Sequence, residues 1–206
     1  MPVRPVAPPV RDPGELAEEL AAAPPGEIPR LLAAARFDPP ELLERMRAEA
    51  SHHYHSDAAR ARGIAERACI AADVTGDLTA VGWSRRALAE SRLFSGKMRE
   101  AEEAYAVAAR AWREAGATAL LGQLLVGRIH VLALLGRMEA VERSAREARR
   151  HLEAAGDGAY LAKLAMNLGN LHFQRDEHAE ALAEYERAAE AFARIGAFLD
   201  KLNQEK

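Results

Sequence analysis

Small apolar residues recur along the chain at a constant step of 40 positions. The columns that share this step are Ala68, Ala108, Ala148, Ala188; Gly76, Gly116, Gly156, Gly196; Ala61, Ala101, Val141, Ala181; and Ala65, Tyr105, Ala145, Tyr185. Several independent columns with one step indicate an internal repeat. Repeats of this length are typical of a solenoid, in which each unit buries its apolar face on the next.

Each repeat reads as a pair of helices with polar or glycine-containing turns. The predicted pairs are 39–55 with 57–75, 77–95 with 97–115, 117–135 with 137–155, and 158–174 with 177–195. The four glycines of the column are expected to end the second helix of each pair, because glycine adopts a left-handed conformation without strain. Gly96 and Gly136 are expected to turn the first helix into the second. Asp38, Asp77 and Asp157 stand where an N-cap is needed.

The N-terminal part of the chain differs from the repeats. Five prolines lie within residues 1–14, which predicts an extended, flexible arm. Two short helical stretches follow, at 15–23 and 27–36, and we interpret 15–38 as a cap that covers the exposed end of the first repeat. A disordered preface is the competing interpretation.

The last repeat carries a recognisable family pattern. Leu168-Gly169 is followed by Ala181, Tyr185 and Ala188 at the spacing of the tetratricopeptide helix hairpin. The segment therefore resembles the tetratricopeptide repeat (TPR) family. The family's usual unit has about 34 residues, so the longer step here resembles its long-repeat subgroup. That subgroup includes bacterial regulators, arrays attached to caspase-like (CHAT) proteases, and peptide-binding adaptors.

The match differs between repeats: repeat four matches well, repeat two matches moderately, and repeat one is weakest. Repeat three has Arg128-Ile129 in place of Leu-Gly, and repeat one has Ala48-Glu49. The resemblance implies an all-α fold: a right-handed superhelical solenoid of four antiparallel helix pairs with an N-terminal cap. The repeats would span about 39–76, 77–116, 117–156 and 157–196. Residues 197–206 would be a C-terminal cap or the start of a truncated fifth repeat, and we favour truncation.

The same resemblance implies a ligand surface on the first helices, which line the concave face of such arrays. The positions expected to form a peptide-binding groove are Arg47, Tyr54, Trp83, Arg86, Glu90, Gln123, His130, Lys163, Asn167, Asn170 and Gln174. Asparagine offers both a donor and an acceptor, which suits the backbone of an extended peptide. The alternative is that these residues are ordinary solvated helix positions.

Composition and charge argue against nucleic acid and membranes as binding partners. A formal net charge of -3 and a sequence pI of 6.2 provide no basic field for nucleic acid. Arg143, Arg146, Arg149 and Arg150 form a basic stripe, but acidic neighbours interrupt it. No apolar run approaches the roughly 20 residues that cross a bilayer. A single cysteine suits a reducing cytoplasm.

The sequence contains no recognisable pattern of catalytic or metal-binding residues. Cys69 occupies a column of mostly small residues and is expected to pack rather than to act as a nucleophile. His52, His53 and His55 lie close together, but no other metal-binding spacing accompanies them. We therefore expect no enzyme activity, no cofactor and no metal.

Three functions remain open. We expect a protein–protein interaction scaffold that binds a peptide or a partner helix in the groove. The alternatives are a regulatory module of a larger signalling or defence protein, such as a CHAT protease, and a solenoid that self-associates through its repeat ends.

Overall fold

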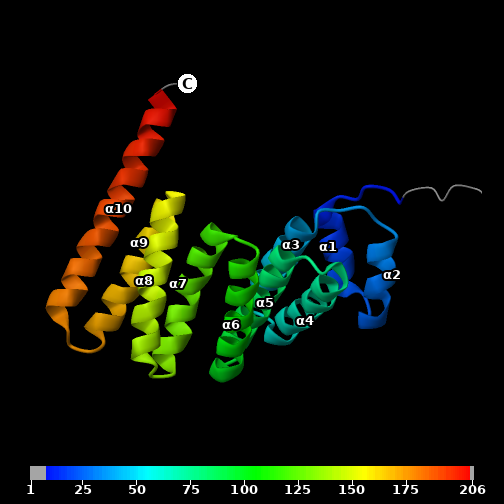
Figure 1. The fold of residues 1–206 in the computed structure, drawn as a ribbon, viewed down its shortest axis with the longest axis horizontal. Helices are drawn as coiled ribbons and strands as arrows, with labels where there is room; N and C mark the ends of the chain where they lie inside the picture. The colour runs from blue at the N-terminus through cyan, green and yellow to red at the C-terminus, as the bar shows by residue number, and fades with distance from the viewer. Residues whose placement is uncertain (1–7, 205–206) are drawn as a thin grey trace, which may run out of the picture. The chain divides into compact units, whose positions relative to one another are not determined.

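The computed structural model describes residues 8–204, with side chains as far as Gly196. This part of the chain is helical and contains no β-strand, so the predicted all-α class is confirmed (Figure 1). The helices are α1 (Pro13–Ala22), the 3-10 turn η1 (Pro25–Glu27), α2 (Ile28–Ala33), α3 (Pro39–His52), α4 (Ala58–Thr75), α5 (Leu78–Phe94), α6 (Met98–Glu114), α7 (Thr118–Leu134), α8 (Met138–Ala155), α9 (Gly158–Phe173) and α10 (His178–Gln204).

The helix starts follow from local hydrogen bonding. The carboxylates of Asp38, Asp77 and Asp157 each accept a hydrogen bond from the backbone N–H three residues later, at 2.9, 2.8 and 3.0 Å. An exposed N–H of the first helical turn is thereby satisfied. The three predicted N-caps are confirmed.

Most of the predicted helix-ending glycines are also confirmed. Gly76 and Gly156 end α4 and α8 with φ of 66° and 67°, and Gly96, Gly116 and Gly136 also have positive φ. Gly196 is different, and the prediction for it is wrong. α10 passes through Gly196 and continues to Gln204, since a glycine inside a helix costs only about 1 kcal/mol relative to alanine.

The chain divides into two compact units after Ala115. In the N-terminal unit, α3 and α4 pack on each other and on α5, and α5 pairs with α6. α1 packs on α3 and α4, and α2 packs on α4. Leu16, Leu20 and Ile28 are fully buried there. The N-terminal helices therefore cover the first hairpin.

Part of the proline-rich segment is held in place, which corrects the expectation of a flexible arm. Arg11 donates its backbone N–H to the carbonyl of Arg36 at 3.0 Å, and Arg36 donates to the carbonyl of Pro9 at 2.8 Å. The Arg11 guanidinium also pairs with Glu19 of α1 at 2.5 Å. Residues 1–7 of the predicted arm lie outside the described residues.

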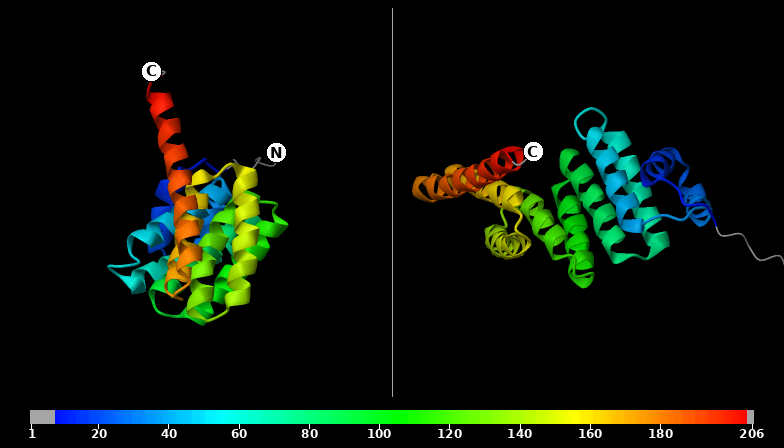
Figure 2. Two further views of the ribbon diagram at one scale, coloured as in Figure 1. Left: turned by 90° about the vertical axis from the view of Figure 1, so that its left-hand side faces the viewer. Right: turned by 90° about the horizontal axis from the view of Figure 1, so that it is seen from above.

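The C-terminal unit consists of the hairpins α7/α8 and α9/α10. Within each hairpin the helices pack extensively, whereas α9 meets α7 and α8 over a much smaller surface. α10 runs well past the end of α9 (Figures 1 and 2). A side-chain account of residues 197–204 as a cap falls outside the described residues.

Two hairpins, α5/α6 and α7/α8, pack a large residue against a glycine. A Cβ on Gly82 of α5 would overlap the indole of Trp112, and one on Gly122 of α7 would lie 3.0 Å from Leu152 Cγ. Trp112 and Leu152 are consequently fully buried. Ala162 and Phe192 hold the same positions 40 residues on.

Candidate functional site

The repeat step places the predicted groove residues in shared columns of the first helices. One column holds Glu90, His130 and Asn170, and another holds Ala87, Gly127 and Asn167. The two units use these positions differently, and each is described on its own.

In the N-terminal unit the predicted groove residues form hydrogen bonds and ion pairs with one another. The carboxylate of Glu90 accepts hydrogen bonds from Arg86 Nε at 2.8 Å, from Arg47 Nη1 at 3.3 Å and from the Tyr54 hydroxyl at 3.0 Å. The guanidiniums of Arg47 and Arg86 lie 5.5 and 5.6 Å from the ring centroid of Trp83. The cluster joins two helices, α3 and α5, and Tyr54 in the turn that follows α3.

Two aromatic contacts extend the cluster, one toward fully buried Trp112 and one toward Phe94, which is 45% exposed. Trp83 meets Trp112 edge-on at 5.0 Å, and Tyr54 stacks on Phe94 at 4.9 Å. Tyr54 is only 8% exposed and Trp83 only 5%. The expectation that these two aromatics lie on an open surface is therefore wrong, because the large rings are covered by the charged side chains and by the neighbouring hairpin.

Electrostatics within the cluster are strongly coupled. Burial opposes ionisation of Glu90, yet the charges of Arg86 and Arg47 outweigh it and hold the pKa of this carboxyl below its usual value. Burial, together with the Glu90 carboxylate, raises the pKa of Tyr54 well above its usual value. Glu90 therefore stays charged and Tyr54 stays a neutral donor. The Glu90 carboxylate already accepts three hydrogen bonds within the cluster, so it has little capacity to bind a ligand.

In the C-terminal unit the residues of the same columns line a pocket. A pocket of about 230 Å³ lies between α7 and α9. We call it the α7–α9 pocket; its lining is Ile129, His130, Ala133, Leu134, Asn167, Asn170, Leu171 and Gln174. Four predicted groove residues thus come together: His130, Asn167, Asn170 and Gln174.

The two asparagines are held but keep hydrogen-bonding capacity. Asn170 Oδ1 accepts a hydrogen bond from the Tyr185 hydroxyl at 2.8 Å, and Asn167 Nδ2 lies 3.5 Å from the carbonyl of Val126. A carboxamide has two donor hydrogens and two acceptor lone pairs. One contact therefore orients each amide and leaves further donors and acceptors for a bound chain.

Two further predicted residues of this unit lie outside the pocket lining. Gln123 donates to the Asp157 carboxylate at 2.8 Å, across the start of α9. The Lys163 ammonium lies 5.5 Å from the ring centroid of Tyr160. Both have local partners.

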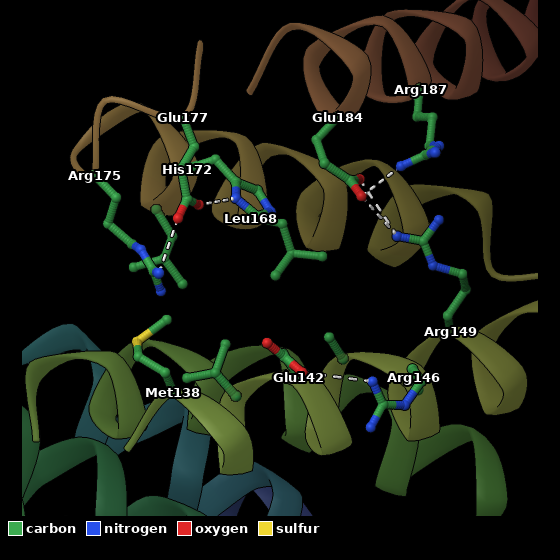
Figure 3. A pocket seen from close by; sticks show the side chains of 13 residues that line it. Met138, Glu142, Arg146, Arg149, Leu168, His172, Arg175, Glu177, Glu184 and Arg187 are labelled. Atoms are coloured by element: carbon green, nitrogen blue, oxygen red, sulfur yellow. Dashed lines mark hydrogen bonds and ion pairs between the residues drawn. The ribbon is translucent and has the colours of Figure 1, made fainter. Parts of the chain in front are cut away.

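A second pocket, of about 420 Å³, lies between α8 and the α9/α10 pair (Figure 3). Glu184 of α10 accepts from Arg149 of α8 at 3.2 and 3.3 Å and from Arg187 at 2.5 Å. Figure 3 shows this bridge at one side of the pocket and His172 with Glu177 at the other. Glu184 is only 8% exposed, and no sequence pattern indicated it, because its partner Arg149 lies 35 residues away.

The charges of this second pocket are already matched. His172 Nδ1 and Glu177 Oε2 are 2.6 Å apart, and this hydrogen bond holds the pKa of Glu177 below its usual value. Arg146, part of the predicted basic stripe, lies 3.7 Å from Glu142. The pocket therefore presents a mixture of ion pairs rather than a field of one sign.

The remaining candidates have structural surroundings. Cys69 is buried with Sγ 3.7 Å from the carbonyl of Ser84, and burial raises the pKa of its thiol. His52 Nδ1 and His53 Nε2 each lie 3.4 Å from Glu49, and His55 contacts the Phe94 ring edge-on. Among the described residues, no three His, Cys, Asp or Glu side chains are grouped as a metal would need. Within the same range, every helix is too short or too polar to span a bilayer.

Comparison with known proteins supports the fold class. The crystal structure of BtubC (BKLC) from P. vanneervenii is similar, with 21% sequence identity and a TM-score of 0.50. The similarity covers 71% of this chain and 72% of that one. At this identity the likeness concerns the helical fold alone. No protein-family model matches the chain, and no curated protein matches it.

Proposed function

We propose that this chain is a protein-interaction module of the tetratricopeptide type, which holds an extended peptide or a partner helix on the exposed face of α7 and α9. The observation that carries the proposal is the α7–α9 pocket, where His130, Asn167, Asn170 and Gln174 converge beside exposed Leu134. The family pattern of the last hairpin and the 40-residue step support the repeat type.

The chemistry of the pocket suits a polypeptide. Its polar groups are carboxamides and one imidazole, and its apolar groups are Ile129, Ala133, Leu134 and Leu171. Carboxamides match the alternating donors and acceptors of a peptide backbone. The small apolar volume would take one side chain of the ligand. Among the described residues, neither lysine, arginine nor a carboxylate lines this pocket, so a peptide without clustered charge fits best.

Preorganisation favours binding. The hydroxyl of Tyr185 fixes Asn170 before a ligand arrives, and the α7 carbonyl of Val126 lies within reach of Asn167. Side chains that are already ordered lose less conformational entropy on association.

The test uses peptides selected from a random display library on the full wild-type chain. Dissociation constants are then measured by fluorescence anisotropy for wild type and for the Asn167→Ala/Asn170→Ala double variant. Loss of two backbone-directed hydrogen bonds should weaken binding by at least about tenfold. The control is Arg143→Ala/Glu153→Ala, two exposed positions on α8, which should bind as wild type does. Equal affinity of all three proteins would overturn the proposal.

A further inference from the structure

The second pocket of the C-terminal unit has an apolar centre. We call it the α8–α10 pocket, and its volume is about 420 Å³. Its apolar lining is Met138, Val141 and Ala145 of α8 and Leu168 and Leu171 of α9. Every described lining residue falls between 138 and 187, so the pocket is formed within two packed hairpins. A cavity of this size with apolar walls and a few polar groups is typical of small-molecule sites.

Loose packing of α9 leaves part of this apolar surface uncovered. α9 meets α7 and α8 over a much smaller surface than it shares with α10, whereas α5 of the N-terminal unit packs closely on both α3 and α4. Met138 and Leu171 are half-buried in the pocket, although Val131, which stands 40 residues before Leu171, is fully buried. A ligand that covered these two side chains would gain the free energy of apolar burial.

Most of the charged side chains around the apolar centre are matched one to one. Arg175 Nη2 lies 2.8 Å from Glu177 Oε1, and the other oxygen of this carboxylate lies 2.6 Å from His172 Nδ1. Arg146 and Glu142, both on α8, form a looser pair at 3.7 Å. Each of these two carboxylates therefore has one arginine.

The opposite end of the pocket holds two arginines for one carboxylate (Figure 3). Arg149 and Arg187 both donate to Glu184, whose side chain is only 10% exposed. These bonds use Nη2 of Arg149 and Nη1 of Arg187, and a guanidinium has five donor hydrogens. Both arginines therefore keep donors for a further anion, and the shared glutamate holds them in place beforehand.

We propose that the α8–α10 pocket binds a small organic acid, whose apolar body lies against Val141 and Leu168 and whose carboxylate takes the donors of Arg149 and Arg187. The planar fork of arginine matches a carboxylate. One surplus positive charge suits a monoanion, whereas a phosphate monoester carries about two negative charges. Charged side chains at both ends limit the length of the apolar body (Figure 3).

This inference goes beyond the proposed peptide site and does not rest on it. The peptide site uses the α7–α9 pocket, and among the described lining residues Leu171 alone is common to both pockets. A failure of the organic-acid proposal would therefore leave the peptide proposal standing.

The test follows the ¹³C-methyl NMR signals of the five methionines of the full chain during titration with sodium octanoate. Met138 lines the pocket and should shift to saturation, whereas Met46, fully buried in the N-terminal unit, should stay unchanged. Octylammonium has the same body with the opposite charge and should bind at least about tenfold more weakly. Hexanoate should lose about fourfold in affinity for each CH₂ group that the pocket no longer buries.

Two arginine variants locate the carboxylate. Arg187→Ala removes the surplus charge while Arg149 still pairs with Glu184, and it should weaken octanoate binding by at least about fivefold. The control is Arg143→Ala, an exposed arginine of α8 outside the pocket lining. It changes the net charge equally and should bind octanoate as wild type does.

Several results would overturn the proposal. They are a Met138 signal that does not move with octanoate, equal binding of octanoate and octylammonium, and unchanged octanoate affinity in Arg187→Ala. The tripeptide Gly-Gly-Leu, which ends in a free carboxylate, represents the end of a polypeptide. Binding of this tripeptide at Met138 more tightly than octanoate would assign the pocket to a chain terminus and would also overturn the proposal.

Discussion

Two regions of this molecule use the same repeat position in opposite ways. In α5 the position is Glu90, whose carboxylate binds two arginines and a tyrosine hydroxyl of its own unit. In α9 it is Asn170, whose carboxamide touches one hydroxyl and remains exposed. The charged residue is engaged within its own unit, whereas the neutral amide stays exposed, where the ligand that we propose would reach it. A repeat position therefore does not reveal its role until its neighbours are known.

The largest expected effect comes from removing the carboxylate. Glu90→Ala removes the carboxylate that binds both Arg47 and Arg86 and should lower the free energy of unfolding by about 3 kcal/mol. Both tryptophans of the chain, Trp83 and Trp112, lie in this unit, so denaturant unfolding followed by tryptophan fluorescence reads it directly. An unchanged midpoint would mean that the cluster contributes nothing to cohesion.

A packing change in the same unit should cost less. Gly82→Ala pushes a methyl group into the buried indole of Trp112 and should destabilise by about 2 kcal/mol, as overpacking usually does. Gly82→Ala/Trp112→Leu should recover part of this loss, because Gly122 with Leu152 shows that a smaller partner is accommodated at this position. Far-UV circular dichroism melts measure both. If the double variant were less stable than Gly82→Ala alone, the large-against-small interpretation would be wrong.

Acid should weaken the N-terminal unit through Glu90. Its folded pKa lies below its usual value, and the unfolded carboxyl titrates near about pH 4.3. The unfolded chain therefore binds the extra proton first, so the stabilisation is present above about pH 4.3 and is lost as the pH falls through the folded pKa. Fluorescence-monitored melting temperatures should drop less steeply with acid in Glu90→Gln than in wild type. Parallel curves for the two proteins would contradict this.

The smallest expected effect on stability comes from Asn170 in the α7–α9 pocket. Asn170→Ala removes one exposed hydrogen bond with Tyr185 and should change the free energy of unfolding by less than about 0.5 kcal/mol. Chemical denaturation followed by circular dichroism checks it. A loss as large as that of Glu90→Ala would show that the amide, too, serves cohesion.

Much of the fold could be predicted because its signals are local. Capping aspartates and left-handed glycines act within a few residues, and the alanine columns mark the buried side of each helix. Gly196 misled because a glycine followed by good helix formers costs too little to end a helix. The prediction of a flexible arm was wrong for residues 9–11, because their hydrogen bonds to Arg36 join segments that are distant in the sequence.

The candidate site was harder to predict from the sequence. The position of Tyr54 and Trp83 on the first helices indicated exposure, but burial depends on which side chains of the next helix cover them. Arg47 and Arg86 flank Trp83 from α3 and α5, and a spacing pattern carries no information on such a contact. The α7–α9 pocket exists because the α7/α8 and α9/α10 hairpins pack less extensively on each other than their own helices do. The sequence pattern does not show how closely two hairpins pack.

The most direct measurement of the central contrast is a hydrogen-exchange footprint of the full chain with and without a selected peptide. We expect slower exchange within 123–134 of α7 and 163–174 of α9, with 83–94 of α5 unchanged. Protection of 83–94 with no change in α7 and α9 would contradict it, because ligand binding would then use the interlocked cluster around Glu90 instead of the open amides.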